Sequence, residues 1–235
     1  MNDSTGPQSV SQRPQGTAGA GDPSSREALG RSPSEARDRS LPVVGEARPE
    51  RADARRNRLK VLEAADRLFA GHGVKNVSLD AIAAEAGVGK GTVFRRFGDR
   101  AGLAVALLDE RERELQARIL SGPPPLGPGA PPVDRIRAFA DAYLELLDRH
   151  VELFIDSENA SDGARYRIGS YWLWHRHITL LVEEARPDLD AAYVAHAVLA
   201  PLAADLHQAL RSEGFELDRL RSGLASLISL LLAPS

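Results

Sequence analysis

One stretch of the chain combines basic side chains, glycines and small apolar residues at a spacing suited to phosphate binding. It runs from residue 78 to residue 97 and reads SLDAIAAEAGVGKGTVFRRF. Its apolar residues can pack two short helices against each other: Ile82, Ala86, Val88, Val93 and Phe97. Gly87 stands where the chain must reverse, in a left-handed conformation that glycine adopts without strain. The stretch therefore predicts a helix-turn-helix motif over residues 78–97.

The second helix of this motif carries most of the polar chemistry. With its apolar side turned inward, four polar residues point outward: Lys90, Thr92, Arg95 and Arg96. A short basic helix that presents its N-terminus suits the major groove of DNA and the phosphates on its rims. Two packed helices with a solvated charged face are the alternative interpretation.

Flanking elements must hold this motif in place. Apolar residues recur at three- and four-residue steps from Leu59 to Phe69, which predicts a helix from Arg51 that ends at Gly71-His72-Gly73. Ser78 is the expected N-cap of the next helix, and Asp80 favours its first turn. Residues 87–91 are expected to form the turn and residues 92–97 the second helix. A longer helix should run from Arg100 to about Ile119.

The rest of the chain also has helical periodicity. Residues 121–132 contain six prolines and should form a connection. One apolar stripe follows from Ile136 to Phe154, a second from Tyr166 to Glu184, and a third from Asp188 to Arg211 with an expected kink at Pro201. No run of period two is long enough to indicate a sheet. The predicted fold class is all-α.

Charge is distributed unevenly along the 235 residues, although the formal net charge is only −3. Residues 51–100 carry 11 basic and 6 acidic side chains, whereas residues 101–235 carry 13 and 20. A basic module on an acidic body indicates one phosphate-binding end. Residues 1–50, rich in Gly, Pro and Ser and without aromatics, should be a disordered tail. The alternative interpretation is an arm whose arginines contact DNA.

Several classes of protein are disfavoured by composition. The chain has no Cys, which excludes disulfide scaffolds, thiolate nucleophiles and Cys-based metal sites. No apolar run is long enough to span a bilayer, and no signal peptide is visible. We therefore expect a soluble intracellular protein. We find no catalytic constellation, cofactor motif or metal motif, so we do not expect an enzyme.

Residues from about 55 to 115 resemble the DNA-binding domain of the TetR (tetracycline-repressor) family of bacterial transcriptional regulators. The following pieces carry the resemblance: Val61-Leu-Glu-Ala-Ala65, Leu68-Phe69, Gly73, Val77-Ser78, Ile82-Ala83, Glu85-Ala-Gly-Val88, Lys90-Gly-Thr92, Phe97, Arg100 and Leu103. The resemblance implies a homodimer that binds a pseudo-palindromic operator. The resulting domain prediction is a tail over 1–50, a DNA-binding domain over 55–115, and an effector-binding and dimerisation domain over 116–235.

The resemblance also implies roles for individual residues of the DNA-binding domain. Those nearest the bases would be Lys90, Gly91, Thr92 and Phe94. Those that hold phosphates would be Ser78, Arg95, Arg96 and Arg100. Phe94 stands where the family often has Tyr, and Gly89 where it often has Ser, so the phenol hydroxyl and the N-cap side chain are both lost. The operator sequence therefore cannot be carried over.

In the family the remaining part usually binds a small effector in an apolar cavity. Amphipathic aromatic residues gather in this half of the chain, and we predict that six of them line such a site: Tyr143, Phe154, Tyr171, Trp172, Trp174 and His175. Ordinary core packing or a dimer interface is the competing interpretation. His175 and His177 are two residues apart, so on a helix they face different sides and do not form a metal pair.

A leucine seam near the C-terminus is the expected dimer interface, with internal packing as the alternative. Its members are Leu217, Leu220, Leu224, Leu227 and Leu231. The resulting hypothesis is a one-component regulator, a repressor released from DNA by a small molecule. An all-α enzyme and an effector-independent architectural DNA-binding protein are the alternative hypotheses.

Overall fold

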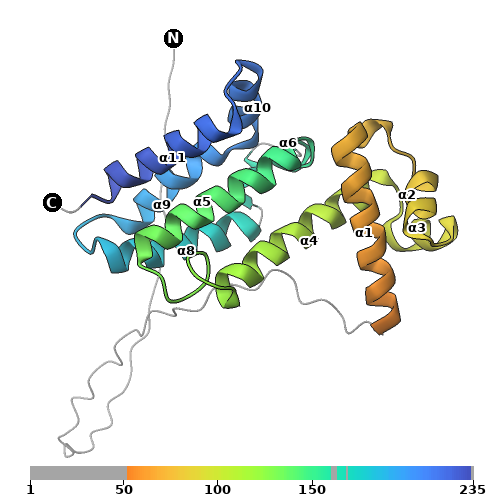
Figure 1. Cartoon of the computed structure of the whole chain (residues 1–235), viewed down its shortest axis with the longest axis horizontal. Helices are drawn as coiled ribbons and strands as arrows, with labels where there is room; N and C mark the ends of the chain where they lie inside the picture. The colour runs from red at the N-terminus through yellow and green to blue at the C-terminus, as the bar shows by residue number, and fades with distance from the viewer. Residues whose placement is uncertain (1–51, 160–162, 168, 234–235) are drawn as a thin grey trace, which may run out of the picture. The chain divides into compact units, whose positions relative to one another are not determined.

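A computed structural model of the chain describes residues 52–159, 163–167 and 169–233, and these residues form helices with no strand among them (Figure 1). The predicted all-α class is confirmed. All described residues belong to one compact unit, Arg39–Ser235. The predicted tail over residues 1–50 lies outside the described residues. Among the described helices, none combines the length and apolar character needed to cross a membrane.

The first part of the described chain contains four α-helices and one 3-10 helix: α1 (Ala52–His72), η1 (Val74–Asn76), α2 (Leu79–Ala86), α3 (Lys90–Phe97) and α4 (Arg100–Ser121). Helix α1 packs on α2 and α4, and α2 packs on α3 (Figure 1). The apolar stripe predicted for α1 forms the buried side of this helix, because Leu62, Ala65 and Phe69 all lie in the core. These helices together form the frame that holds α3.

The second part begins after a proline-rich connection and contains the remaining helices: α5 (Pro132–Arg149), α6 (Val151–Glu158), α7 (Ala164–Arg167), α8 (Gly169–Ala185), α9 (Ala191–Leu199), η2 (Ala200–Leu202), α10 (Ala204–Ser212) and α11 (Leu217–Leu231). Helix α5 packs against both α8 and α11, and α8 packs along α9. Phe139, Trp174 and Ile228 are among the fully enclosed side chains of this core. Because α4 runs unbroken through residue 115 and contacts α6, it links the two parts.

Two stripes expected to form single helices are each divided in two. The first ends at Arg149, and a new helix starts after His150, whose carbonyl accepts the backbone N–H groups of Leu153 and Phe154. The second stripe, from Tyr166 to Glu184, lies on α7 and α8, and the residue between them is outside the described residues. In the third, the kink expected at Pro201 is a break: proline has no N–H to donate, so α9 ends at Leu199 and α10 begins after an extended residue, Ala203.

Candidate nucleic-acid interface and ligand cavity

The turn between α2 and α3 has the geometry that its residues predict. The Ser78 hydroxyl accepts a hydrogen bond from the Ala81 backbone N–H at 3.1 Å, so Ser78 is the N-cap of α2. Gly87 ends the same helix in the left-handed region, at φ 66° and ψ 33°. The Val88 N–H donates to the Ala83 carbonyl at 3.0 Å. A side chain at residue 87 would strain this reversal, which explains the glycine.

Helix α3 begins two residues earlier than the sequence suggests. Residues 90 and 91 were expected in the turn, but the helix spans Lys90–Phe97. Gly89 is its N-cap and makes no side-chain hydrogen bond, while its carbonyl accepts the Thr92 N–H at 2.8 Å. The glycines at 87, 89 and 91 favour a turn, but only residues 87–89 form it, and α3 begins at Lys90. The bare N-terminus of α3 leaves backbone donors free for an anion.

The two faces of α3 differ sharply. Val93 is fully buried and Phe97 half-buried, and both pack into the core that contains Ile82. The opposite face is exposed and includes every α3 residue predicted to touch DNA: Lys90, Gly91, Thr92, Phe94, Arg95 and Arg96. Phe94 is 61% exposed, which is unusual for a large apolar side chain. The exposed face of α3 is therefore basic with one aromatic residue at its centre.

Several cations of this face have partners within the chain. Lys90 Nζ lies 2.8 Å from a carboxylate oxygen of Asp80, in a pair whose side chains are both more than half exposed. The Arg95 Nε donates to the Gly91 carbonyl at 3.2 Å. The Arg100 guanidinium donates to the Lys75 carbonyl at 2.6 Å. These contacts are exposed and exchange readily with water or phosphate.

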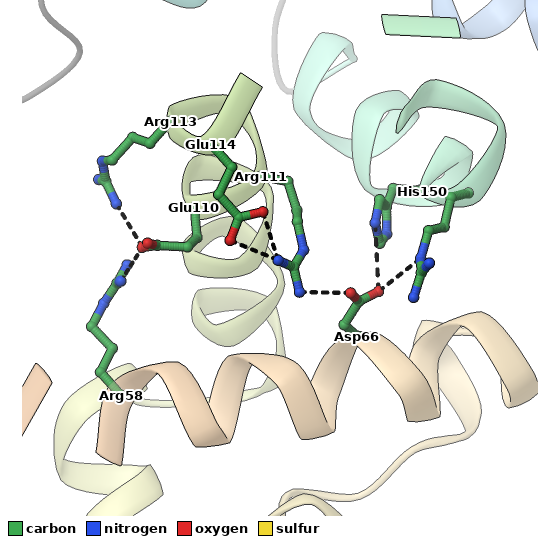
Figure 2. A network of polar contacts seen from close by, with 8 residues as sticks. Arg58, Asp66, Glu110, Arg111, Arg113, Glu114 and His150 are labelled. Atoms are coloured by element: carbon green, nitrogen blue, oxygen red, sulfur yellow. Dashed lines mark hydrogen bonds and ion pairs between the residues drawn. The ribbon is translucent and has the colours of Figure 1, made fainter. Parts of the chain in front are cut away.

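A buried carboxylate, Asp66, joins the helix-turn-helix part to the second part of the chain (Figure 2). It projects from α1 and pairs with Arg111 of α4 at 2.6 Å and with Arg149 of α5 at 3.1 Å. His150 Nε2 lies 3.5 Å from the same carboxylate and makes no hydrogen bond. Burial lowers the pKa of His150 to about 4 despite the attraction of Asp66, so the imidazole is neutral at pH 7.

Further contacts tie the same elements together. Glu110 of α4 pairs with Arg58 of α1 and also with Arg113 one turn further along its own helix (Figure 2). Glu152 of α6 accepts a hydrogen bond from the Val74 backbone N–H at 3.2 Å. A shift of α4 therefore changes its contact with α1 at Arg58, and a shift of α6 changes its contact with η1 at Val74. The arrangement can transmit a change in the second part to the helix-turn-helix.

The six aromatic residues predicted to line a ligand site divide into two groups. Four of them line one small cavity: Tyr143, Phe154, Tyr171 and Trp174. This cavity has a volume of about 20 Å³, enough for one water molecule. Trp172 is 48% exposed and donates to the Tyr166 carbonyl, and His175 bonds the Ala192 carbonyl. The predicted aromatic site is thus a closely packed cluster with little empty space.

A larger opening adjoins this cluster through three shared residues. A groove of about 850 Å³ lies along α4 and α6 and shares Leu108, Glu112 and Ser157 with the small cavity. Glu112 is only 6% exposed, and burial raises its pKa to about 7, although a hydrogen bond from Ser170 opposes the shift. Arg100 and Lys75 line the opposite end of the groove. The groove therefore extends from predicted DNA contacts to a buried carboxyl.

Sequence reasoning missed Glu112 and Asp66 as functional candidates. Each lies four residues after a buried leucine of its helix, Leu108 and Leu62 respectively, and is therefore a carboxylate within an apolar stripe. A carboxylate at such a position was the feature of the sequence that could have identified both residues. The structure also shows the burial of the five residues in the predicted leucine seam. Leu224 is buried, and the other four are half-buried against the core of their own chain.

Comparison with known proteins agrees with this geometry. Residues 61–107 match the family model described as bacterial regulatory proteins, tetR family. Over 53 residues the chain is 45% identical to an HTH-type transcriptional regulator of Staphylococcus aureus (strain USA300), a match that covers 23% of this chain and 29% of that relative. The chain thus aligns with less than a third of the length of this relative.

Solved structures extend the likeness to the whole fold. A TetR-family transcriptional regulator from Rhodococcus sp. superposes with a TM-score of 0.57 at 20% identity, covering 76% of this chain and 100% of that one. A transcriptional regulator from Saccharomonospora viridis, in complex with choline, gives a TM-score of 0.60 at 22% identity, covering 73% and 95%. The helix-turn-helix domain of the chain, residues 61–107, is therefore similar to that of the bacterial regulatory proteins of the tetR family, and the solved structures share the all-α fold of the chain.

Proposed function

We propose that this protein is a homodimeric repressor of transcription that binds a palindromic operator and is released by a small molecule. The observation that carries the proposal is the outward face of α3, where basic residues surround the exposed Phe94 while Val93 and Phe97 hold the helix from behind. The geometry is that of a recognition helix, whose exposed side enters the major groove. Repression in the bacterial cytoplasm is part of the same proposal.

The proposal includes two groups of DNA contacts, which the resemblance of residues 55–115 to the TetR family implies. Lys90, Thr92 and Phe94 approach the bases, and Gly91 permits close contact because it has no side chain. Ser78, Arg95, Arg96 and Arg100 hold phosphates and set the register. In the free protein Lys90 is paired with Asp80, so base contact requires that this exposed pair open.

Dimerisation is proposed to use the outer surface of α10 and α11. Leu230 is 79% exposed and Leu206 42% exposed, which leaves apolar area for a second copy to cover. The half-buried seam residues, Leu217, Leu220, Leu227 and Leu231, contribute the area that their own core leaves uncovered, around the buried Leu224. A two-fold dimer presents two recognition helices, which accounts for a palindromic operator.

Release by an effector is supported by the link between the two parts of the chain. A ligand in the groove along α4 and α6 touches two helices that contact the helix-turn-helix part: Arg111 of α4 pairs with Asp66 of α1, and Glu152 of α6 accepts a hydrogen bond from Val74 of η1. Differential binding to two arrangements of these helices would shift the recognition helices. The similar protein from Saccharomonospora viridis is in complex with choline, which supports a small-molecule effector here.

Selection of operators from random double-stranded DNA tests the proposal. We expect a palindromic site. Lys90→Ala should lose about 1–3 kcal/mol of binding free energy and relax the base preference at one position of each half-site. Arg100→Ala should weaken binding to all sequences and reduce the salt slope by about one.

Arg118→Ala is the matched control, since it removes an equal charge from the exposed end of α4. Affinity unchanged in both the Lys90 and the Arg100 variants, or lost equally in the Arg118 variant, would contradict the assignment of α3. Operator binding that no compound releases would favour an architectural role.

A further inference from the structure

We propose that the effector is an alkylammonium, an organic cation with an apolar substituent, that binds in the groove along α4 and α6 with Glu112 as its counter-ion. The proposal rests on the proposed function, because it names the chemical class of the effector. The groove has a volume of about 850 Å³, which is in the range of small-molecule sites. Two features of its lining, and the aromatic cluster behind Glu112, favour a cation over a neutral or anionic ligand.

The first feature is the charge of Glu112. Its carboxyl is 6% exposed and its hydrogen-bond partner is the neutral Ser170 side chain. Among the described residues, no Lys, Arg or His forms an ion pair with it, whereas the neighbouring Glu110 has two arginine partners. A buried carboxyl without a cation is costly to ionise, and a ligand cation supplies the missing partner.

The second feature is the position of other charges along the groove. Asp109 and Asp156 line it together with Glu112, and the Asp156 carboxylate is exposed. The two basic side chains, Lys75 and Arg100, lie at the α4 N-terminus, twelve residues before Glu112 in the case of Arg100. That separation is about three helical turns, or roughly 18 Å. Arg113 and Arg165 also lie near Glu112, but they are paired with Glu110 and Glu158, so the balance of charge around Glu112 is acidic and favours a cation there.

The third feature is the aromatic cluster behind Glu112. Tyr143, Phe154 and Trp174 line the small cavity that shares Glu112 with the groove. The guanidinium of Arg165 lies 5.6 Å from the centre of the Tyr171 ring, so this cluster already accepts one cation of the chain itself. Ring faces attract ammonium groups in the same way. Because the small cavity holds only about 20 Å³, the ligand reaches Glu112 from the groove.

The apolar substituent follows from the groove walls. Leu108 and Leu153 form part of the lining, and Val105 on the same wall is 60% exposed. An alkyl chain that covers these side chains removes apolar area from water. A cation without such a chain would leave them exposed, so we expect affinity to increase with chain length.

The test compares three probes of equal chain length: hexyltrimethylammonium, hexanol and hexanoate. Binding is followed by calorimetry and by tryptophan fluorescence, which reports on the site because Trp174 is in the cluster and Trp172 adjoins it. We expect the cation to bind at least about tenfold more tightly than the alcohol and hexanoate to bind more weakly than either. Hexanoate binding more tightly than the cation would overturn the proposal and assign the groove to an anion held by Lys75 and Arg100.

The acid–base chemistry of Glu112 provides a second readout. A bound cation favours the ionised carboxylate, so binding at pH 6 should release close to one proton and binding at pH 8.5 almost none. Affinity should rise about tenfold between pH 6 and pH 8 and then level off. Buffers of different ionisation enthalpy measure this proton release by calorimetry. Binding of the cation without proton release at either pH would show that Glu112 is not the counter-ion.

Two variants and one control assign the site. Glu112→Gln keeps the shape of the side chain and should lose at least about tenfold in affinity for the cation, together with the pH dependence. Val105→Trp fills the groove from an exposed position and should also abolish binding. Glu184→Gln removes a carboxylate from an exposed position on α8 and should bind as the original chain does. Equal affinity in all three variants would overturn the proposal.

The test of the effector class and the test of the proposed function can fail independently of each other. Operator binding is measured without any ligand, so a protein that binds its operator but not the cation overturns the effector class and leaves the regulator intact. Conversely, cation binding that requires Glu112, in a protein that selects no DNA from the random pool, supports this site and contradicts the proposed function.

Discussion

Asp66 and Glu112 are two carboxylates in equivalent settings with different surroundings. Each lies in the apolar stripe of a long helix, and each is 6% exposed. Asp66 is held by two arginines from two other helices, at 2.6 and 3.1 Å. Glu112 has a serine partner and no ion pair among the described residues, and it borders the groove of about 850 Å³. Burial alone therefore does not define the role of an acidic side chain.

The difference lies in what neutralises each charge. At Asp66 the cations come from within the chain, so the carboxylate connects α1, α4 and α5 permanently (Figure 2). At Glu112 no ion pair among the described residues supplies a cation, and burial raises the pKa of the carboxyl to about 7. One carboxylate stabilises the link between the two parts of the chain, and the other is available to a ligand beside that link.

Removal of the Asp66 charge should have the largest effect. Asp66→Asn keeps the side-chain volume but leaves Arg111 and Arg149 without their shared anion, and the Arg111 side chain is only 19% exposed. We expect the free energy of unfolding at pH 7 to fall by about 3 kcal/mol, the typical result of breaking a buried pair from one side. Urea denaturation measures the change.

A matched control is present on the same arginine. Glu114 pairs with Arg111 from an exposed position one turn along α4. Glu114→Gln should cost less than about 1 kcal/mol, because exposed pairs contribute little. Equal losses in the two variants would show that burial of the Asp66 pair adds no stability, and the contrast with Glu112 would disappear.

Replacement of Glu112 should have an effect of similar size but opposite sign, and it should depend on pH. Burial raises the pKa of the folded carboxyl to about 7 from its ordinary value of 4.5. Between these values the unfolded chain binds fewer protons than the folded chain, so stability falls as pH rises from about 4.5 to 7. The full loss is about 3 kcal/mol. Glu112→Gln has no carboxyl to ionise, so it should not show this loss of stability.

The measurement is the difference in unfolding free energy between Glu112→Gln and the original chain at several pH values. This difference should increase in favour of the variant from pH 5 to pH 8, while the contributions of all other groups cancel. Asp66→Asn, which is destabilised throughout, should show no such increase between pH 6 and pH 8. A flat difference for Glu112→Gln would mean that Glu112 is already neutralised by a partner within the chain.

Local features of the fold and the DNA interface could be predicted from the sequence, and contacts between distant segments could not. The N-cap at Ser78, the reversal at Gly87 and the inward position of Val93 depend on neighbours within about ten residues. The partners of Asp66 are 45 and 83 residues away along the chain. Nothing in the spacing of the Arg111 and Arg149 side chains indicates that they meet the same carboxylate.

The helix breaks illustrate the same limit. A continuous stripe from Ile136 to Phe154 predicts one helix, because the apolar spacing is kept through residue 150. The chain turns at His150, where burial of the ring next to Asp66 places α5 and α6 at the link with α1. An apolar stripe shows which side of each helix is buried. It does not show where the chain changes direction while the same side stays inside.

The smallest effect on stability should come from an exposed counterpart of the Asp66 pair, the contact between Asp80 and Lys90. Both side chains are more than 60% exposed, so Asp80→Asn should change the free energy of unfolding by less than about 1 kcal/mol. Operator affinity should nevertheless increase about threefold at low salt, because Lys90 is released and one negative charge leaves the interface. The increase should shrink as salt screens the interface.

Glu85→Gln removes an equal charge from the same helix, but its partner is Arg67 of α1 and no residue of α3. If both variants bind the operator equally well, the gain reflects net charge, and Lys90 is not restrained by Asp80 in the free protein.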